Sequence, residues 1–474
     1  MNHKISISKF LGSVLFLLFI VVLCFSIIPS SVVNGNIFVI ITFLINAFIS
    51  LVMLVVSSGK RLYSLETTHW IFYFFFFVFA PMIQFSTSKY PVWLIPTHSE
   101  LINTNILLTL WALLFALATN LVRKTPRLKT EKRVKYVSIS YNHMIILMVV
   151  SIVITLYKLV TIGFLELLSR STAFGEEFTF SSIEQLFTHS INAIVILCFA
   201  FACIYNRREK HRFILFVSTL CMVICIFPTG TARYNAATVY FAAIMFLMPQ
   251  IIKGRRFTYL FILGLIVVFP LLDAFRRTSF AEVDISSYFN GVFSEYSYYF
   301  TEGHYDAYAM IIRSIRHISS NGITWGFQLL GNILFFIPRS IWTSKPIGTG
   351  AMIMTELNAD FTNVSAPLPA EGIVNFGYFG MLLFAIVLGV VVKKFDDYYW
   401  FDFDNKNKGF FSSLDVFYCY FVSLLFFILR GDLMSSTAYT AAYFVVCYLL
   451  SHVYFQSARI DLPDKDVSVR IKKQ

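Results

Sequence analysis

The sequence predicts an all-α membrane protein that crosses the bilayer about 12 times. Of its 474 residues, 57% are hydrophobic and only 14% are charged, whereas a soluble globular chain is nearer half apolar and a quarter charged. Apolar runs that are long enough to cross a bilayer as helices recur along the chain. A backbone that crosses lipid must satisfy its own hydrogen bonds, so these runs are expected to be helices.

The predicted spans divide the chain into four regions. Residues 1–274 hold nine spans, 275–370 form a loop, 371–455 hold three more spans and 456–474 form a tail. Lys4 and a second lysine precede the first run without a small-residue cleavage site, so this run is interpreted as a span. The predicted spans are 10–28, 36–57, 69–86, 104–122, 142–163, 184–205, 211–228, 232–249, 257–274, 371–392, 412–430 and 434–455.

The distribution of lysine and arginine sets the predicted orientation. With the N-terminus inside the cell, every loop predicted to be cytoplasmic is basic, as the positive-inside bias requires. The net charge of +12 is therefore attributed to orientation and to attraction to anionic membrane lipid, with no nucleic-acid partner. Both termini are predicted to be cytoplasmic. The basic groups lie at 60–61, 123–135, 207–212, 253–256 and 393–408 and in the tail.

The loop at 275–370 is predicted to lie on the exterior face, between the ninth and tenth spans. Apolar residues recur at helical spacing over 311–318 and 325–342, interrupted by Gly331 and Pro338. This pattern predicts interfacial helices that lie over the membrane face. Long loops with structure of their own commonly carry function, so we expect functional residues here.

Lysines and arginines in exterior loops run against the positive-inside bias, so their presence there has to be explained. One reason is that arginines hold a phosphate or pyrophosphate through bidentate, charge-assisted hydrogen bonds. The alternative is that each cation snorkels to the interface or pairs with Glu295, Glu302 or Glu371. The exterior cations in question are Arg233, Arg276, Arg277, Arg313, Arg316, Arg339, Lys345 and Arg430.

Several residues could supply acid–base chemistry. Glu371 opens the tenth span, and a carboxylate at membrane depth usually has a partner or a function. Glu302, His304 and Asp306 could be metal ligands by type, but their spacing does not place all three on one helical face. A general base drawn from Glu302, His304 or Glu371 is favoured over a metal site. We therefore predict neither a metal nor a cofactor.

Three short stretches resemble the Wzy family, the polymerases of O-antigen and capsule repeat units. Residues 229–234 are similar to the family's Thr-Gly-x-Arg-like turn, displaced here by one residue. Residues 337–346 resemble its Pro-x-x-x-Trp-x-x-Lys-Pro stretch, and 371–377 resemble its Glu followed by Asn-Phe-Gly at the start of a span. The predicted span count, sidedness and large late loop also resemble the family.

The resemblance implies a metal-independent glycosyltransferase of the bacterial inner membrane, related in fold to the GT-C enzymes. Such an enzyme takes oligosaccharide repeats linked to undecaprenyl pyrophosphate at the periplasmic face. It transfers the growing chain from its carrier to a new repeat and releases undecaprenyl pyrophosphate. A flippase and a chain-length regulator are the partner proteins that the family implies.

Within that reaction the candidate residues take two roles. Negative charge develops on the pyrophosphate leaving group, and fixed cations stabilise it without a metal. Glu371 is the first candidate to position or deprotonate the acceptor hydroxyl, and His304 is the second. Arg277 is a near-equal alternative to Arg276, and Lys345 acts in support. The predicted pyrophosphate-binding residues are Arg233, Arg276, Arg277, Arg339, Lys345 and Arg430.

Two other functions stay open on the sequence. An O-antigen ligase would share the topology and the donor but would transfer the glycan to lipid A-core. A lipid-linked glycan transporter would bind the glycan without making a bond. Charges within the spans are scarce, with Lys158 as the main exception, and no G-x-x-x-x-G-K-[ST] phosphate loop is present, which argues against ion-coupled and ATP-driven transport.

Overall fold

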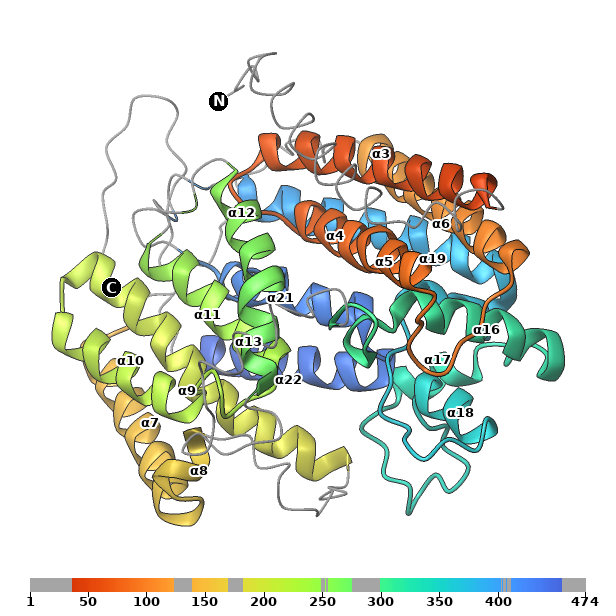
Figure 1. Ribbon diagram of the computed structural model, residues 1–474. Coiled ribbons are helices and arrows are strands. Elements are labelled where there is room, and N and C mark those ends of the chain that lie inside the picture. The colour runs from red at the N-terminus through yellow and green to blue at the C-terminus, as the bar shows by residue number, and fades with distance from the viewer. Residues whose placement is uncertain are drawn as a thin grey trace.

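The computed structural model describes residues 36–122, 139–168, 182–248, 252, 255–274, 299–401, 403, 406 and 411–453. Over these residues the protein is all-α, and no strand occurs among them (Figure 1). The predicted span at 10–28, the cations Arg276 and Arg277 and the predicted tail at 456–474 lie outside the described residues.

The first described helices form a tightly packed group. Helices α3, α4 and α6 lie side by side in the upper part of Figure 1, and α19 packs against α6. The rod formed by α4, the π-helical segment η1 and α5 is buried almost throughout, because α3, α19 and α21 surround it. The bounds are α3 Ile37–Lys60, α4 Leu65–Phe74, η1 Phe75–Phe79, α5 Ala80–Thr87 and α6 His98–Leu121.

The next helices form a second group around α9, which packs against α7, α10, α11 and α22. In Figure 1, α7, α8, α9 and α10 of this group lie at the lower left. The bounds are α7 Tyr141–Thr161, α8 Phe164–Leu168, α9 Ser182–Glu209, α10 Arg212–Cys225 and α11 Arg233–Leu247. The segment after α11 holds α12 Arg256–Leu263, η2 Gly264–Val268 and α13 Phe269–Ala274, and α12 packs against α4.

Three short helices from the predicted exterior loop lie together at one end of the molecule, on the right of Figure 1. They are α16 (Ala307–Asn321), α17 (Phe327–Ile333) and α18 (Thr349–Glu356), preceded by the single turn η3 (Gly303–Tyr305). Helix α16 packs against α19, α6 and η1. Helix α16 contains the predicted helical segment 311–318, whereas α17 covers only the first part of the predicted segment 325–342.

The last three helices complete the bundle: α19 (Leu368–Trp400), α21 (Ser413–Arg430) and α22 (Leu433–Val453). Helix α21 is central, because it packs against α4, α11, α19 and α22. Its N-terminus carries a capping box, in which Ser412 and Asp415 each accept a hydrogen bond from the other's backbone N–H.

Helix α19 is broken near its start. Phe376 and Gly377 have non-helical dihedral angles, and Gly377 lies at φ +67°, a conformation that favours glycine. The short piece before the break folds closely onto the long piece after it. A Cβ atom on Gly380 would lie 2.2 Å from the carbonyl oxygen of Gly372, so this contact requires glycine.

Eight helices of the described chain are long and apolar enough to cross a membrane, which makes the protein a multi-pass membrane protein. Their outward faces carry exposed apolar side chains such as Phe38, Phe48 and Val160, as expected of a surface that lipid covers. The candidate spans are Ile37–Lys60, Leu65–Thr87, His98–Leu121, Tyr141–Thr161, His189–Glu209, Leu368–Trp400, Ser413–Arg430 and Leu433–Leu450.

Three predicted spans contain shorter helices than expected. The runs 211–228, 232–249 and 257–274 hold α10 with 14 residues, α11 with 15 residues and the helix Arg256–Leu272. A 14-residue helix rises only about 21 Å, against roughly 30 Å for the hydrocarbon core. Apolar residues beyond the helix ends, such as Phe227, lengthen a hydropathy run although they are not helical.

The helix bundle has two opposite ends. At one of them, which we call the basic end, Arg61 pairs with Asp396 at 3.1 Å and Arg207 donates to the carbonyl of Lys406 at 3.3 Å. At the opposite end, which we call the capped end, α16, α17 and α18 lie over the bundle (Figure 1). The start of α11 and the end of α21 belong to the capped end. Among the residues that the structure describes, Arg61 and Arg207, predicted to be cytoplasmic, therefore lie at the opposite end from Arg233 and Arg430, predicted to be exterior.

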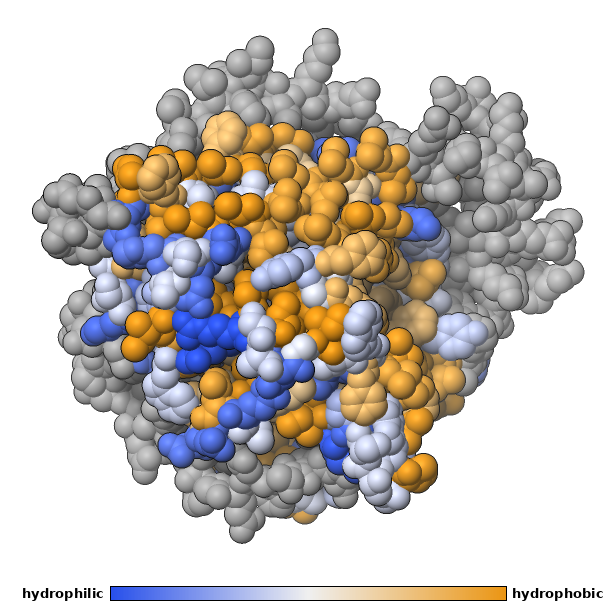
Figure 2. All heavy atoms as spheres, turned by 90° about the vertical axis from the view of Figure 1, so that its right-hand side faces the viewer, coloured by the Kyte–Doolittle hydropathy of each residue, from blue (hydrophilic) through white to orange (hydrophobic). Residues whose placement is uncertain are grey.

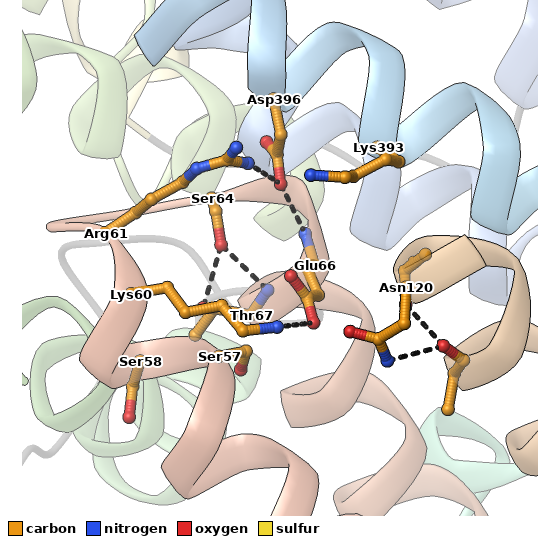
Figure 3. A network of polar contacts seen from close by, with 12 residues as sticks. Ser57, Ser58, Lys60, Arg61, Ser64, Glu66, Thr67, Asn120, Lys393 and Asp396 are labelled. Atoms are coloured by element: carbon orange, nitrogen blue, oxygen red, sulfur yellow. Dashed lines mark hydrogen bonds and ion pairs between the residues drawn. The ribbon is translucent and has the colours of Figure 1, made fainter. Parts of the chain in front are cut away.

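A buried ion network organises the basic end (Figure 3). Asp396 is fully buried and pairs with Arg61. It also accepts hydrogen bonds from the backbone N–H groups of Leu65 at 2.9 Å and Glu66 at 3.2 Å, and from the hydroxyl of Tyr418 at 2.5 Å. This carboxylate therefore caps the first turn of α4 and ties α19 to α4 and α21.

Candidate functional site

Polar side chains from several helices gather at the capped end. Figure 2 looks onto this end and shows hydrophilic side chains grouped among hydrophobic ones. The segment 299–306, which leads into α16, contacts both the first residue of α11 and the last residue of α21. Two arginines that the sequence singled out therefore meet on one short segment.

Arg430, the last residue of α21, binds this segment from one side. Its Nε donates to the carbonyl of His304 at 3.0 Å, and its Nη2 donates to the carbonyl of Gly303 at 3.1 Å. The same Nη2 pairs with Asp306 at 3.2 Å. Asp306 is buried, and its second oxygen accepts a hydrogen bond from the backbone N–H of Ser365 at 2.9 Å. The Arg430 side chain is 31% exposed, so a ligand can reach it.

Arg233, the first residue of α11, approaches from the other side. Its Nη2 lies 2.7 Å from Nδ1 of His304, and its Nη1 donates to the hydroxyl of Tyr299 at 3.0 Å. The guanidinium carbon lies 5.7 Å from the ring centre of Phe269, a cation–π distance. The ring of His304 thus contacts Arg233, while its backbone is bound by Arg430.

The turn before α11 fixes the position of Arg233. The hydroxyl of Thr229 donates to the carbonyl of Leu168 at 2.5 Å. A Cβ atom on Gly230 would lie 1.9 Å from the carbonyl oxygen of Leu167, so only glycine fits there. The turn that carries the first resemblance stretch is therefore packed directly against the end of α8, and it presents Arg233 from a fixed backbone.

Glu371 lies in the short piece of α19 that precedes the break, and it is buried. Its Oε1 accepts a hydrogen bond from the backbone N–H of Leu433 at 2.9 Å, and its Oε2 accepts one from the hydroxyl of Thr349 at 2.7 Å. Both carboxylate oxygens therefore have partners. These contacts join the starts of α18 and α22, and so they fix the turn that follows Arg430.

A second carboxylate belongs to the same turn. Asp432 accepts hydrogen bonds from the backbone N–H and the hydroxyl of Ser435 at 2.9 and 3.0 Å, and so caps α22. A Cβ atom on Gly348 would lie 3.0 Å from its carboxyl group, which shows how closely the segment before α18 packs against it. Burial raises the pKa of Asp432.

Arg339 and Lys345 lie between α17 and α18 and bind backbone carbonyls there. Arg339 donates to the carbonyl of Lys345 at 2.6 Å. The ammonium of Lys345 donates to the carbonyl of Phe335 at 2.6 Å, and the side chain is buried. Burial and, to a smaller extent, Arg339 lower the pKa of Lys345. In the part of the chain that the structure describes, neither cation contacts Arg233 or Arg430.

Arg313 and Arg316 bind groups of the protein itself, which is the alternative to binding a phosphate ligand. Arg316 holds Glu100 through two hydrogen bonds of 2.6 and 2.9 Å. Arg313 donates to the carbonyls of Val92 and Trp93, each at 2.8 Å. These two arginines join α16 to the first turn of α6 and to the segment before it, so exterior position alone does not mark a binding residue.

The partners of the site residues could not be read from the sequence. By residue type Asp306 could be a metal ligand, yet the structure pairs it with Arg430, which is 124 residues away in the chain. Tyr299 and Thr349 were not selected at all. A tyrosine or threonine in a loop gives no sequence signal, because its role depends on which distant group the fold brings to it.

The arrangement suits an anionic ligand. Two guanidinium groups flank the His304 segment, and guanidinium binds phosphate oxygens bidentately. The described structure thus defines a multi-pass all-α membrane protein with a cationic site at one end of its bundle. Comparisons with models of known families, with curated proteins and with solved structures find no match for this chain.

Proposed function

We propose that this protein is a metal-independent glycosyltransferase that polymerises oligosaccharide repeats linked to undecaprenyl pyrophosphate, with a fold related to the GT-C enzymes. The observation that carries the proposal is the meeting of Arg233, His304 and Arg430 at the capped end. In this proposal the capped end faces the periplasm of a bacterial inner membrane. The basic end then faces the cytoplasm, as the positive-inside bias requires.

The proposed reaction breaks one bond and forms one. The bond between the donor's anomeric carbon and the phosphate oxygen breaks, and its electron pair leaves with undecaprenyl pyrophosphate. A bond forms between that carbon and a hydroxyl oxygen at the non-reducing end of the acceptor repeat. Arg233 and Arg430 stabilise the charge that develops on the leaving pyrophosphate. Arg339 and Lys345 support the surrounding loop, which is consistent with their carbonyl contacts.

The acceptor hydroxyl must also lose its proton. The contacts favour His304 over Glu371 as the proton acceptor, because the His304 ring lies beside Arg233, where the donor phosphate would bind. Nδ1 of His304 accepts from Arg233 in the described structure, and in this proposal its lone pair becomes available when the guanidinium turns to the phosphate. Glu371 is buried and both of its oxygens accept hydrogen bonds. We therefore assign Glu371 a positioning role, in which it holds the turn that carries Arg430.

Deletion of the gene tests the proposal. Loss of a polymerase leaves single repeats on the surface glycolipid, loss of a ligase leaves none, and loss of a transporter removes the glycan from the exterior face altogether. We expect single repeats. Complementation with Arg233→Met should fail to restore long chains, whereas Arg316→Met, a loop arginine that holds Glu100, should restore them. Absence of every repeat from the surface glycolipid would rule out polymerisation.

A further inference from the structure

A second polar cluster lies near the ends of two spans, with Lys158 three residues before the end of Tyr141–Thr161 and His189 as the first residue of His189–Glu209. Lys158, in α7, donates a hydrogen bond to the side-chain oxygen of Asn192 in α9. Three residues earlier in α9, the ring of His189 lies 3.9 Å from the ring of Tyr439, measured between their centres. Residues three apart share a helix face, so His189 and Asn192 lie on the same side of α9. Lys158 and His189 are within electrostatic range of one another.

Lys158 is the one cation of this cluster, and no described anion accompanies it. Among the residues that the structure describes, Lys158 forms no ion pair, and its hydrogen-bond partner is the neutral amide of Asn192. All three side chains are half-buried rather than buried. A cation inside a span without a carboxylate is costly, and it usually marks a binding site.

Aromatic side chains connect the cluster to the Arg233 site. Tyr439 meets Tyr234 edge to face at 5.3 Å, and Tyr234 directly follows Arg233. Tyr234 in turn stacks on Phe427 at 4.0 Å, one helical turn before Arg430. Tyr439 and Tyr234 therefore lie between the Lys158 cluster and the Arg233 site. Both tyrosine side chains are half-exposed.

The proposed reaction requires two binding sites for lipid pyrophosphate, so this inference rests on the proposed function. A polymerase joins two substrates that each carry a lipid pyrophosphate, whereas a ligase or a transporter handles one. The donor loses its pyrophosphate at the Arg233 and Arg430 site. The acceptor keeps its own, which must be bound elsewhere while its glycan reaches the donor.

We propose that Lys158, His189 and Asn192 form a second site, which binds the pyrophosphate of the acceptor repeat. No bond to this pyrophosphate is made or broken. Its oxygens accept hydrogen bonds from the ammonium of Lys158 and the amide of Asn192, and the acceptor glycan extends past Tyr439 and Tyr234 toward Arg233. The same phosphate chemistry could come from bulk anionic lipid, which the experiment must separate from the acceptor.

The test uses the full-length protein in nanodiscs of neutral lipid, with a donor repeat whose non-reducing end is blocked and a labelled acceptor repeat. Lys158→Gln should raise the KM for the acceptor roughly tenfold or more, the usual cost of a lost charged hydrogen bond. The KM for the donor should stay within about twofold, because the donor site is intact. Lys158→Arg should keep the acceptor KM near wild type, and Lys89→Gln, an exposed lysine, should change neither.

Several outcomes would overturn the inference. An unchanged acceptor KM in Lys158→Gln, or an equal rise for both substrates, rejects an acceptor site. If Lys158→Gln changes only how activity depends on added phosphatidylglycerol, Lys158 binds bulk anionic lipid and not the acceptor. Should Lys158→Gln not fold, His189→Phe, which keeps a ring beside Tyr439, gives the same readout.

Binding of undecaprenyl pyrophosphate separates this inference from the proposed function. Wild-type protein should bind two molecules per chain, and Lys158→Gln should bind one. Two molecules bound by both proteins would reject the second site. Wild-type protein that makes no glycosidic bond defeats the proposed function, whereas transfer by wild type with equal binding in the variant defeats only this inference.

Discussion

Replacing Arg430 tests whether this arginine acts on substrate or only holds the fold. Arg430 contacts the carbonyls of Gly303 and His304 and pairs with the buried carboxylate of Asp306. Methionine keeps much of the aliphatic volume and removes the charge and the donors. In Arg430→Met, Asp306 would keep only its hydrogen bond from the backbone N–H of Ser365.

The structural cost can be bounded from these contacts. Removing one partner of a buried ion pair costs about 3–5 kcal/mol. Because Arg430 is 31% exposed and water can reach the site, we expect about 2 kcal/mol instead. The double variant Arg430→Met with Asp306→Asn removes the unpaired charge and keeps an acceptor for Ser365. It should therefore recover all but about 1 kcal/mol, the net value of the lost carbonyl hydrogen bonds.

The turnover number kcat should not recover in the double variant, although its stability should. If the Arg430 guanidinium stabilises the leaving pyrophosphate, kcat should fall about a hundredfold or more in both Arg430 variants. Asp306→Asn alone should keep kcat within a few-fold of wild type. The assay pairs the melting temperature in nanodiscs with the rate of transfer between lipid-linked repeats. A double variant that regains both stability and rate would show that Arg430 only supports the fold, and would refute its proposed role.

Three further substitutions give independent checks. Gly380→Ala should destabilise the fold by about 2 kcal/mol or more, because its Cβ would lie 2.2 Å from the carbonyl oxygen of Gly372. Its melting temperature should lie well below that of the control Gly264→Ala, whose Cβ would lie 3.7 Å from the nearest atom, in the ring of Phe241. Burial raises the pKa of Asp432, so its contribution to stability is full at acid pH and is lost as pH rises through the folded pKa. Asp432→Asn keeps the helix cap and should raise the melting temperature at pH 8 but not at pH 4; the same shift at both pH values would contradict this. Glu371→Gln can still accept the backbone N–H at the start of α22 and should keep transfer within about fivefold, whereas Glu371→Ala should lose about a hundredfold; a general base would make the two variants equally inactive.

The long spans were predictable because periodicity and length suffice to find them. Helices α3, α6 and α7 lie within a few residues of the predicted runs at 36–57, 104–122 and 142–163. The runs at 211–228 and 232–249 are longer than the helices α10 and α11 that they contain, because hydropathy does not register where a helix ends. Phe227 and Pro228 follow the end of α10, and Met248 follows the end of α11, yet two of these three residues count as apolar.

The side-chain pairings were not predictable, because they join residues far apart in the chain. Asp396 was assigned to a basic cytoplasmic loop, yet it caps α4, 331 residues earlier in the sequence. The sequence selected Arg233, His304 and Arg430 individually, by residue type and expected side. That Arg233 contacts the His304 ring and Arg430 its carbonyl depends on how α11 and α21 pack together, and no local pattern specifies this packing.

The most direct measurement is the stoichiometry of the purified reaction. Full-length protein in nanodiscs would be given one defined repeat linked to undecaprenyl pyrophosphate, with no divalent metal added. Chain length and free undecaprenyl pyrophosphate would be followed together. We predict chains of two repeats and more, with one undecaprenyl pyrophosphate released for each glycosidic bond formed. Substrate that stays a single repeat with its carrier attached, under conditions in which the protein is folded, would contradict the proposed function.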